Sequence, residues 1–431
     1  MRVGRHHMGP SAVSARFSIV ALSLVLSVTA CGSATATQAK QPIKIGAEGP
    51  MTGTFASTGQ ALWEGAQVAA KEINDAGGIL GRPLHLDQID DVNDPADAVP
   101  ALRKAINVDG IQFLDGPSST VRPATQPILD QNKIPFMFQG GTASFDHNSD
   151  PYAWRPSPSD IQLGVAMAAY AIKKGYKTAA MMFNTGPSQS LEQVVSDAYK
   201  RNGGTVVANT VLALAVSSYG SEVQTVVKSH PDVIFAQYDD TTAPALFHAL
   251  EQQNNLAIPI IGSDESAGAA QIKLITPAAA HKALVSVEAS TNTGPAVDTY
   301  KHYYNLVYPG QVVNTAANFS YDAIIELALA IDAAGSTDPA KVIAAIPQVC
   351  NPPGTDVTNY ADGLAALNAH KKIHFVGAGG PSGYDQYHNS TGTFSVYQAD
   401  ATTGVEAPIA ALSVSDMAAA AQGSLAFGTT G

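Results

Sequence analysis

The sequence has very little cysteine and no motif that commonly holds a metal ion. Only Cys31 and Cys350 occur in 431 residues. The eleven histidines show no close metal-ligand spacing beyond His6 and His7, and neither HExxH nor CxxC is present. If Cys31 is modified, Cys350 has no partner for an internal disulfide. We therefore expect no disulfide, no metal site and no other cofactor.

Positive charge is also scarce. The chain has 24 Lys and Arg against 36 Asp and Glu, a formal net charge of -12. Three of the basic residues, Arg2, Arg5 and Arg16, lie within the first 30 residues, and no basic cluster follows them. Because nucleic-acid binding depends on Lys and Arg that neutralise phosphates, this composition argues against a nucleic-acid partner.

Motifs of common enzyme classes are missing as well. The sequence has no GxSxG nucleophile elbow and no P-loop. A glycine-rich stretch, GAGGPSG at 377–383, lies late in the chain and not at the first strand-to-helix turn, where a dinucleotide site requires it. We therefore predict that the protein is not an enzyme.

The first 30 residues have the pattern of a signal peptide. They contain no acidic residue, and residues 17–28 form an apolar run that is too short to span a membrane. The following VTAC ends at Cys31 and resembles the lipobox of bacterial lipoproteins, whose cysteine sulfur forms a thioether to a diacylglyceryl group. The resemblance implies that Cys31 anchors the protein to a bacterial membrane, outside the cytoplasm. Ordinary signal cleavage beside an unrelated cysteine is the alternative.

From Ile43 onward, short apolar runs alternate with longer amphipathic segments. IKIGAE at 43, LHLDQID at 84 and IPFMFQG at 134 fit buried strands, and the alternation restarts after AWRPSPSD at 153–160. This rhythm predicts βαβ units and parallel sheets covered on both faces. The predicted fold class is α/β, with two doubly wound parallel-sheet lobes.

Several segments resemble a known family. IKIGAEGPMTGTFASTGQALWEGAQVAAKEINDAGGILGRPLHL at 43–86, followed in order by DDVNDPADAV, GPSST, IPFMFQGGT and NFSYDAIIELALAI, is similar to type I periplasmic solute-binding proteins of branched-chain amino-acid ABC transporters. The resemblance implies two lobes, joined by three crossing segments, that close over a small polar ligand.

The resemblance also divides the chain. It implies a signal peptide at 1–30, a lipidated tether at 31–41 and a C-terminal tail at 413–431. Lobe one would consist of 42–155 plus 290–372, and lobe two of 156–289 plus 373–412.

Candidate ligand groups of lobe one follow predicted strands. Ser118 and Ser119 in GPSST stand where hydroxyls and a helix N-terminus favour an anion, and the resemblance assigns the ligand carboxylate to Ser119. It also implies that the Gly140 carbonyl and the Thr142 side chain contact the ligand, and it places Phe55 at an aromatic rim. The alternatives are a helix N-cap at Ser119, a plain Gly-Gly turn, and a half-exposed loop aromatic.

In lobe two, Asp264 matches the acid that pairs with the ligand ammonium group in the family, and its neighbour Glu265 could substitute for it. The alternative for Asp264 is a helix N-cap. Tyr238 is expected at the cleft, where its ring would stack on or enclose the ligand, with Asp239 beside it. A solvated charge at a helix start is the alternative for Asp239.

Two departures from the family pattern bear on these predictions. Family members can form a disulfide between the positions that are Asn93 and Ser118 here, so we expect other contacts to fix this loop. FNTGPSQS at 183–190 has Pro187, Ser188 and Gln189 where a tyrosine commonly covers the ligand side chain. Leucine is therefore not assumed as the ligand.

Together, these features predict an extracytoplasmic solute-binding lipoprotein of an ABC importer that captures an amino acid or a similar small polar ligand. Its partners would be the ligand, an ABC permease and, through the lipid anchor, the membrane. The alternative is a ligand-sensing receptor of the same fold that is coupled to a membrane signalling protein. Both functions need a closing cleft, so the sequence does not separate them.

Overall fold

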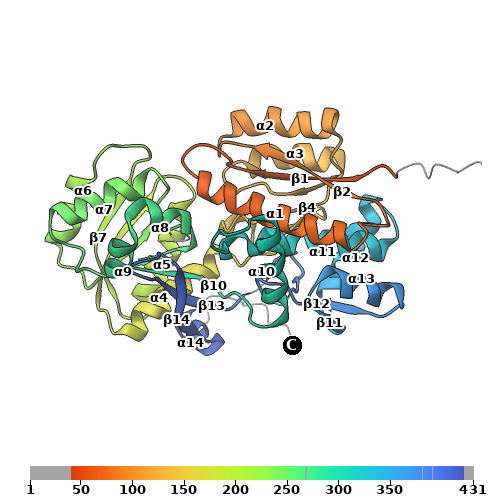
Figure 1. Cartoon of the computed structure of the whole chain (residues 1–431). Coiled ribbons are helices and arrows are strands. Elements are labelled where there is room, and N and C mark those ends of the chain that lie inside the picture. Colours follow the sequence, from red (N-terminus) through yellow and green to blue (C-terminus); the bar gives the residue numbers. More distant parts are fainter. Residues whose placement is uncertain (1–39, 267–268, 381, 391, 422–431) are drawn as a thin grey trace, which may run out of the picture. The chain divides into compact units, whose positions relative to one another are not determined.

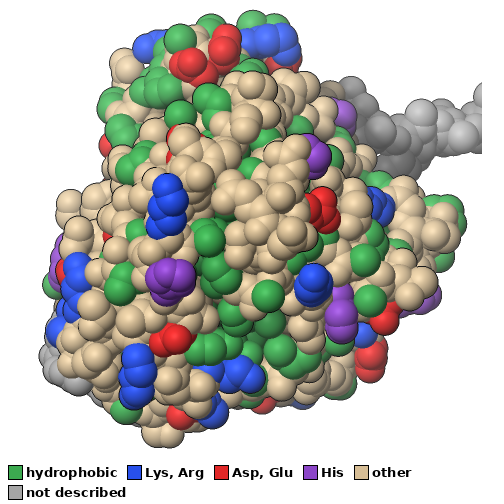
Figure 2. All heavy atoms as spheres, turned by 90° about the vertical axis from the view of Figure 1, so that its left-hand side faces the viewer, with side chains coloured by type: hydrophobic (Ala, Val, Ile, Leu, Met, Phe, Trp, Pro, Cys, Tyr) green, Lys and Arg blue, Asp and Glu red, His purple; other side chains and the backbone are tan. Residues whose placement is uncertain are grey.

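The computed structural model describes residues 40–266, 269–380, 382–390 and 392–421 (Figure 1). The predicted signal peptide and Cys31 lie outside these residues. Within the described ranges, no helix combines the length and the apolar character that crossing a membrane would require. On the face that Figure 2 shows, Lys and Arg side chains are scattered among uncharged ones.

The first sheet has five parallel strands in the order β2-β1-β3-β4-β5. Except for the edge strand β2, which is partly exposed and mixed in polarity, its strands are buried on both faces, which explains their apolar character. They are β1 (Ile43–Gly49), β2 (Leu84–Asp90), β3 (Phe113–Asp115), β4 (Phe136–Met137) and β5 (Ala153–Trp154). The helices of this half are α1 (Ala56–Asp75), α2 (Pro95–Lys104), α3 (Arg122–Asn132), α10 (Pro295–Val307), α11 (Asn318–Ala334), α12 (Pro339–Cys350) and α13 (Tyr360–Asn368).

Helices α1 and α11 pack closely over this sheet. Gly65 of α1 makes the contact possible, because a Cβ atom there would lie 2.2 Å from the Ala317 carbonyl oxygen. Most of α11 is buried, including the acids Asp322 and Glu326. Cys350, at the end of α12, is buried in the same core, and its burial raises the pKa of the thiol.

The second sheet has seven strands in the order β14-β13-β10-β9-β8-β6-β7. The neighbouring strands β7, β6, β8, β9 and β10 pair in parallel. Strands β13 and β14 add an antiparallel edge that the sequence did not predict. The strands are β6 (Thr178–Asn184), β7 (Thr205–Leu212), β8 (Val233–Gln237), β9 (Ile260–Gly262), β10 (Leu284–Ala289), β13 (Phe394–Ala399) and β14 (Glu406–Leu412). Its helices are α4 (Asp160–Lys174), α5 (Ser188–Arg201), α6 (Gly220–Lys228), α7 (Thr242–Gln252), α8 (Ala269–Ile275), α9 (Pro277–Ala283) and α14 (Val414–Ala421).

The C-terminal part differs from the division expected at residue 373. Strand β12 (Ile373–Phe375) pairs in parallel with β11 (Thr355–Val357), so that Phe375 lies in the core of the first half, and Tyr384 is buried there too. The expected tail begins as helix α14, whose Met417 is buried in the core of the second half. After leaving the second sheet at β10, the chain therefore returns to it only at β13. The second half extends past Leu412.

Three chain segments that lead from one sheet to the other are hydrogen-bonded side by side. Arg155 N, after the edge strand β5, donates to His388 O at 2.9 Å, and Ser390 N donates back to Arg155 O at 2.9 Å. Ser290 N, after β10, donates to Thr393 O at 2.7 Å. All three connections are thus linked at one place, as a hinge between two halves requires.

Candidate functional site

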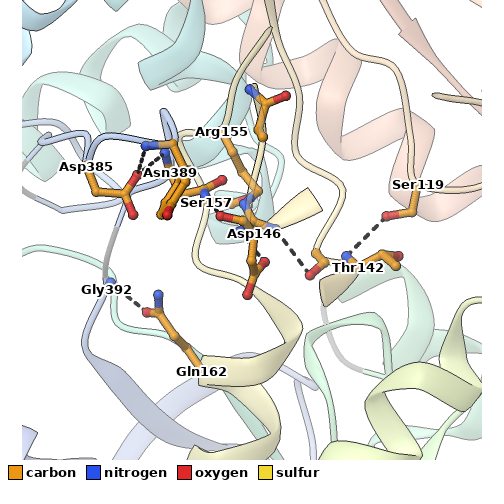
Figure 3. Close-up of polar contacts among 12 residues, drawn as sticks. Ser119, Thr142, Asp146, Arg155, Ser157, Gln162, Asp385, Asn389 and Gly392 are labelled. Atoms are coloured by element: carbon orange, nitrogen blue, oxygen red, sulfur yellow. Dashed lines mark hydrogen bonds and ion pairs between the residues drawn. The ribbon is translucent and has the colours of Figure 1, made fainter. Parts of the chain in front are cut away.

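Ser119 and Thr142 come together at the edge of the first sheet (Figure 3). They follow β3 and β4, which are neighbouring parallel strands, and the backbone N of Thr142 donates to Ser119 Oγ at 3.4 Å. Such an edge is where ligands bind in open α/β sheets. Thr142 Oγ1 is out of contact with solvent and has no partner among the described residues. This hydroxyl is therefore available to a ligand that enters here.

The two glycines before Thr142 make room for other protein groups. A Cβ atom on Gly140 would lie 2.5 Å from Ser119 Oγ, and one on Gly141 would lie 2.0 Å from Asp160 Oδ1. Larger residues would push both side chains away. We expected the glycines to let the backbone approach a bound molecule, but in the structure they let it approach Ser119 and Asp160.

Asp160 lies against the Thr142 loop and is a candidate site residue that no sequence pattern indicated. It begins α4, directly after the first connection between the sheets, and its backbone N donates to Gly141 O at 2.7 Å. An acid at the end of AWRPSPSD was the available signal. Its significance depends on the contact with Gly141, which the linear sequence does not show.

The loop that carries Ser118 is fixed by a side-chain contact. Ser118 Oγ donates to Asn93 Oδ1 at 3.2 Å. The expectation that another contact fixes this loop is therefore confirmed. The donor of the Ser118 hydroxyl is engaged within the protein, which makes Ser119 the better candidate for a ligand.

Two buried arginines support the loop that carries Thr142. The guanidinium carbon of Arg122 lies 3.7 Å from the ring centroid of Phe138 and 4.2 Å from that of Phe145, so the cation lies against both rings. Arg155 pairs with Asp146 at 2.5 Å and donates to Gly141 O at 3.4 Å. Figure 3 shows the Arg155–Asp146 pair next to Thr142. The contacts of the two arginines therefore fix the loop in the absence of a ligand.

Two acids follow strand β9 of the second sheet, and one of them contacts the end of the neighbouring strand β8. Asp264 and Glu265 lie in a 3-10 turn after β9 (Asp264–Ser266), and solvent reaches both side chains. Gln237, the last residue of β8, donates from Nε2 to Glu265 Oε2. The Gln237 side chain is only 7% exposed, and its Oε1 has no partner in the part of the chain that is described.

Electrostatics link these acids to Asp160. Although solvent reaches Asp264 and Glu265, the surrounding protein atoms reduce their hydration, which raises the pKa of Asp264 to about 6. The same desolvation, with repulsion from Asp264, raises the pKa of Glu265 to about 7. Desolvation and then repulsion from Asp264 and Glu265 raise the pKa of Asp160 well above its ordinary value. The three acids are therefore neighbours, and Asp160 connects them to the Thr142 loop.

The structure places Tyr238 away from this site. Its side chain is 1% exposed, its ring packs against Phe247 and its hydroxyl donates to Ser266 O at 3.4 Å. Successive side chains of a strand point to opposite faces, so when Gln237 reaches Glu265, Tyr238 enters the core below α7. Asp239 is also buried, and its Oδ1 accepts from Thr242 N at 2.6 Å at the start of α7. The predicted roles of Tyr238 and Asp239 at the ligand are therefore corrected.

The remaining predicted residue, Phe55, is half-buried and directly precedes α1. The loop that carries it contacts the second half, because Asp240 N donates to Thr54 O at 3.1 Å. Two cavities, of about 370 and 240 Å³, lie beside α10 instead, and none of the predicted site residues lines either of them.

Residues 42–403 of the chain match the family described as periplasmic binding protein. One relative is the Leu/Ile/Val-binding protein BraC3 of Rhizobium johnstonii, which is 28% identical over 243 residues. The aligned part covers 52% of this chain and 66% of the relative, just under two thirds of its length.

Solved structures have the same fold. A leucine binding protein from Thermotoga maritima aligns with a TM-score of 0.74 and 21% identity, covering 87% of this chain and 99% of the other. A solute-binding protein from R. palustris in complex with benzoate aligns with a TM-score of 0.71 and 19% identity, covering 86% and 96% of the two chains. The predicted fold class is confirmed.

Proposed function

The chain belongs to the periplasmic binding protein family, and we propose that it serves an ABC importer by capturing an amino acid or a similar small polar ligand outside the cytoplasm. One observation carries this proposal. Asp160 N donates to Gly141 O, next to the free Thr142 hydroxyl of the first half, and the Asp160 carboxyl is repelled by Asp264 and Glu265 of the second half. This link supports the assignment of groups from both halves to opposite ends of one zwitterion.

The ligand carboxylate is assigned to Ser119 and Thr142. Leucine, isoleucine, valine and benzoate, which relatives are named for or hold, have a carboxylate in common. Hydroxyls that follow a parallel strand suit such an anion. The Gly140 carbonyl and Asp264 then take the ammonium group, with Asp264 as the charged partner.

Capture occurs by closure. The ligand binds the first half, and the second half then rotates about the linked connections at Arg155, Ser290 and His388 until Asp264 completes the site. Only the closed form holds both halves in a fixed relation, so it is the form that a permease would recognise.

The lipid anchor at Cys31 is part of the proposal. It would keep the binding protein at the membrane surface near the permease. Stable anchoring needs more than one acyl chain, which the lipoprotein modification supplies.

A thermal-shift screen of the mature chain tests the binding function. The panel contains amino acids, small carboxylates, amides and polyamines. A ligand in excess over its Kd raises the melting temperature, and the double variant Ser119→Ala/Thr142→Ala should lose that rise. Thr225→Ala, which removes an exposed hydroxyl from α6, is the matched control and should keep it. If no compound at millimolar concentration raises the melting temperature, the proposal fails.

Transport is tested by uptake. Cells that lack the gene should take up the identified ligand more slowly, and the intact gene should restore uptake whereas the Ser119→Ala/Thr142→Ala gene should not. Normal uptake in its absence, together with a lost transcriptional response to the ligand, would favour the sensor instead.

A further inference from the structure

This inference rests on the proposed function and concerns the class of its ligand. We propose that the site takes a basic amino acid, with a second positively charged nitrogen in its side chain, in preference to a neutral one. The second cation would lie among Asp160, Glu265 and Gln237, beside the place assigned to the α-ammonium group at Asp264.

The first argument is the balance of charge. Three carboxyl groups, those of Asp160, Asp264 and Glu265, are close enough to repel one another, whereas a neutral amino acid brings a single ammonium group. None of the ion pairs formed by the described residues includes these acids. Arg155 attracts Asp160, but its guanidinium group is paired with Asp146. A second cation on the ligand would supply the missing charge.

The second argument rests on an uncharged side chain, that of Gln237. The buried Gln237 side chain donates from Nε2 to Glu265, and this bond fixes the direction of the amide, because two acceptor oxygens would repel each other. The atom left without a partner is therefore the acceptor, Oε1. Leaving such an atom buried and unpaired is unfavourable. An N–H donor of the ligand would satisfy it.

Other atoms around the acids can also accept. Ser263, just before Asp264, is fully buried and its Oγ has no partner within the described ranges. The groups on this side of the site that can still accept a hydrogen bond are thus carboxyl groups, an amide oxygen and a hydroxyl. Ammonium and guanidinium groups carry only donors and match this set.

A metal ion fits the acids less well. Among the described residues, no group of three or more Asp, Glu, His or Cys side chains is arranged to hold one. An organic cation reaches its partners by hydrogen bonds and does not need that convergence.

Calorimetric titration of the mature chain with a matched pair of probes tests the proposal. L-lysine and L-norleucine differ in the terminal ammonium group, and we expect lysine to bind at least about tenfold more tightly. Equal or tighter binding of norleucine would overturn the inference while leaving the proposed function intact. If no amino acid binds but another compound of the screening panel does, this inference fails and the proposed function stands; if no compound of the panel binds, the proposed function fails as well. Binding of 1,5-diaminopentane or Ca²⁺ without lysine would overturn the assignment to an amino acid.

A charge variant tests the location. Glu265→Gln should reduce the preference for lysine over norleucine by about tenfold, because it removes the carboxylate nearest to Gln237. Glu251→Gln is the control, since Glu251 is exposed near the far end of α7, away from the edge where that helix begins. Unchanged melting temperatures without ligand show that both variants fold. An unchanged preference in Glu265→Gln would overturn the location.

Discussion

Asp240 accepts two hydrogen bonds from Ser57, one from the backbone nitrogen at 2.8 Å and one from Oγ at 2.7 Å. Ser57 lies in the first turn of α1, where unpaired N–H groups favour a carboxylate. Asp240 lies in the other half, between β8 and α7. The carboxylate thus caps a helix of the opposite half, which is possible only while the two halves are together.

The first prediction concerns the lifetime of the closed state. Asp240→Asn should speed ligand dissociation by about tenfold, because it removes a charge-assisted contact that opening must break. Stopped-flow measurement with the identified ligand checks this. Asp94→Asn is the control, since Asp94 caps α2 within the first half. Equal dissociation rates for Asp240→Asn and the unchanged protein would contradict a role in closure.

The second prediction concerns the ammonium partner. Asp264→Asn should weaken binding of an amino acid by about tenfold or more, since a hydrogen bond to a charged group contributes about 1.5–3 kcal/mol. Calorimetry measures the affinity, and a matching unfolding curve shows that the variant is folded. Unchanged affinity would remove the assignment of Asp264.

The third prediction concerns the pH dependence of stability. Burial raises the pKa of Asp115 and that of Glu326 to about 7, and both accept hydrogen bonds from hydroxyl groups, of Ser320 and of Tyr384. The same carboxyls have pKa values of about 4 in an unfolded chain. Between about pH 4 and 7 the folded protein therefore keeps protons that the unfolded chain has lost, so its stability falls as pH rises.

Urea unfolding at pH 5 and pH 8 checks this dependence. The free energy of unfolding should be larger at pH 5, and Asp115→Asn or Glu326→Gln should reduce the difference between the two values. Greater stability at pH 8, or a difference that neither variant changes, would contradict the argument.

The fourth prediction concerns a disulfide in place of the hydrogen bond between Asn93 and Ser118. The double variant Asn93→Cys/Ser118→Cys should form a disulfide in oxidising conditions, because the two side chains are already in contact. A closed loop of this size should raise the free energy of unfolding by about 3 kcal/mol, less the strain of a positive φ at residue 93. Denaturation with and without reductant measures the gain. No gain on oxidation would show that the two loops approach differently.

The fifth prediction concerns the anchor. Cys31→Ser should release the protein from the membrane fraction, because the sulfur that carries the lipid is missing. Mass spectrometry of the intact protein should show acyl groups at residue 31 in the unchanged chain. A membrane-bound Cys31→Ser protein would contradict lipidation at this position.

Much of the fold could be predicted because local patterns determine it. The expected helix from Asn318 to about Ala334 is α11, which ends where Gly335 adopts a left-handed conformation. The buried strand β1 was expected from IKIGAE. Helix α14 was missed because its Ala-rich sequence has little polar contrast, although Ser413 and Asp416 form a capping box at its start: Asp416 N donates to Ser413 Oγ at 3.1 Å, and Ser413 N donates to Asp416 Oδ2 at 3.0 Å.

The site could be predicted only in part. The contact between Ser119 and Thr142 could be expected because both lie in loops that follow neighbouring strands of one parallel sheet; their role at a ligand stays a prediction. The direction of the Tyr238 side chain could not be predicted, because a strand buried on both faces has no polar alternation that shows which side chain faces the site. Asp160 depends on a contact between a connection and the Gly140–Gly141 turn, and such contacts exist only in three dimensions.

The burial of Cys350 makes the protein convenient for observing closure directly. A thiol that is out of solvent and has a raised pKa reacts slowly with maleimides. In a chain that lacks Cys31, fluorophores can therefore be attached to cysteines introduced at exposed positions on α2 and α6, with the native thiol left in place. Energy transfer between the two dyes would then report opening and closing in single molecules.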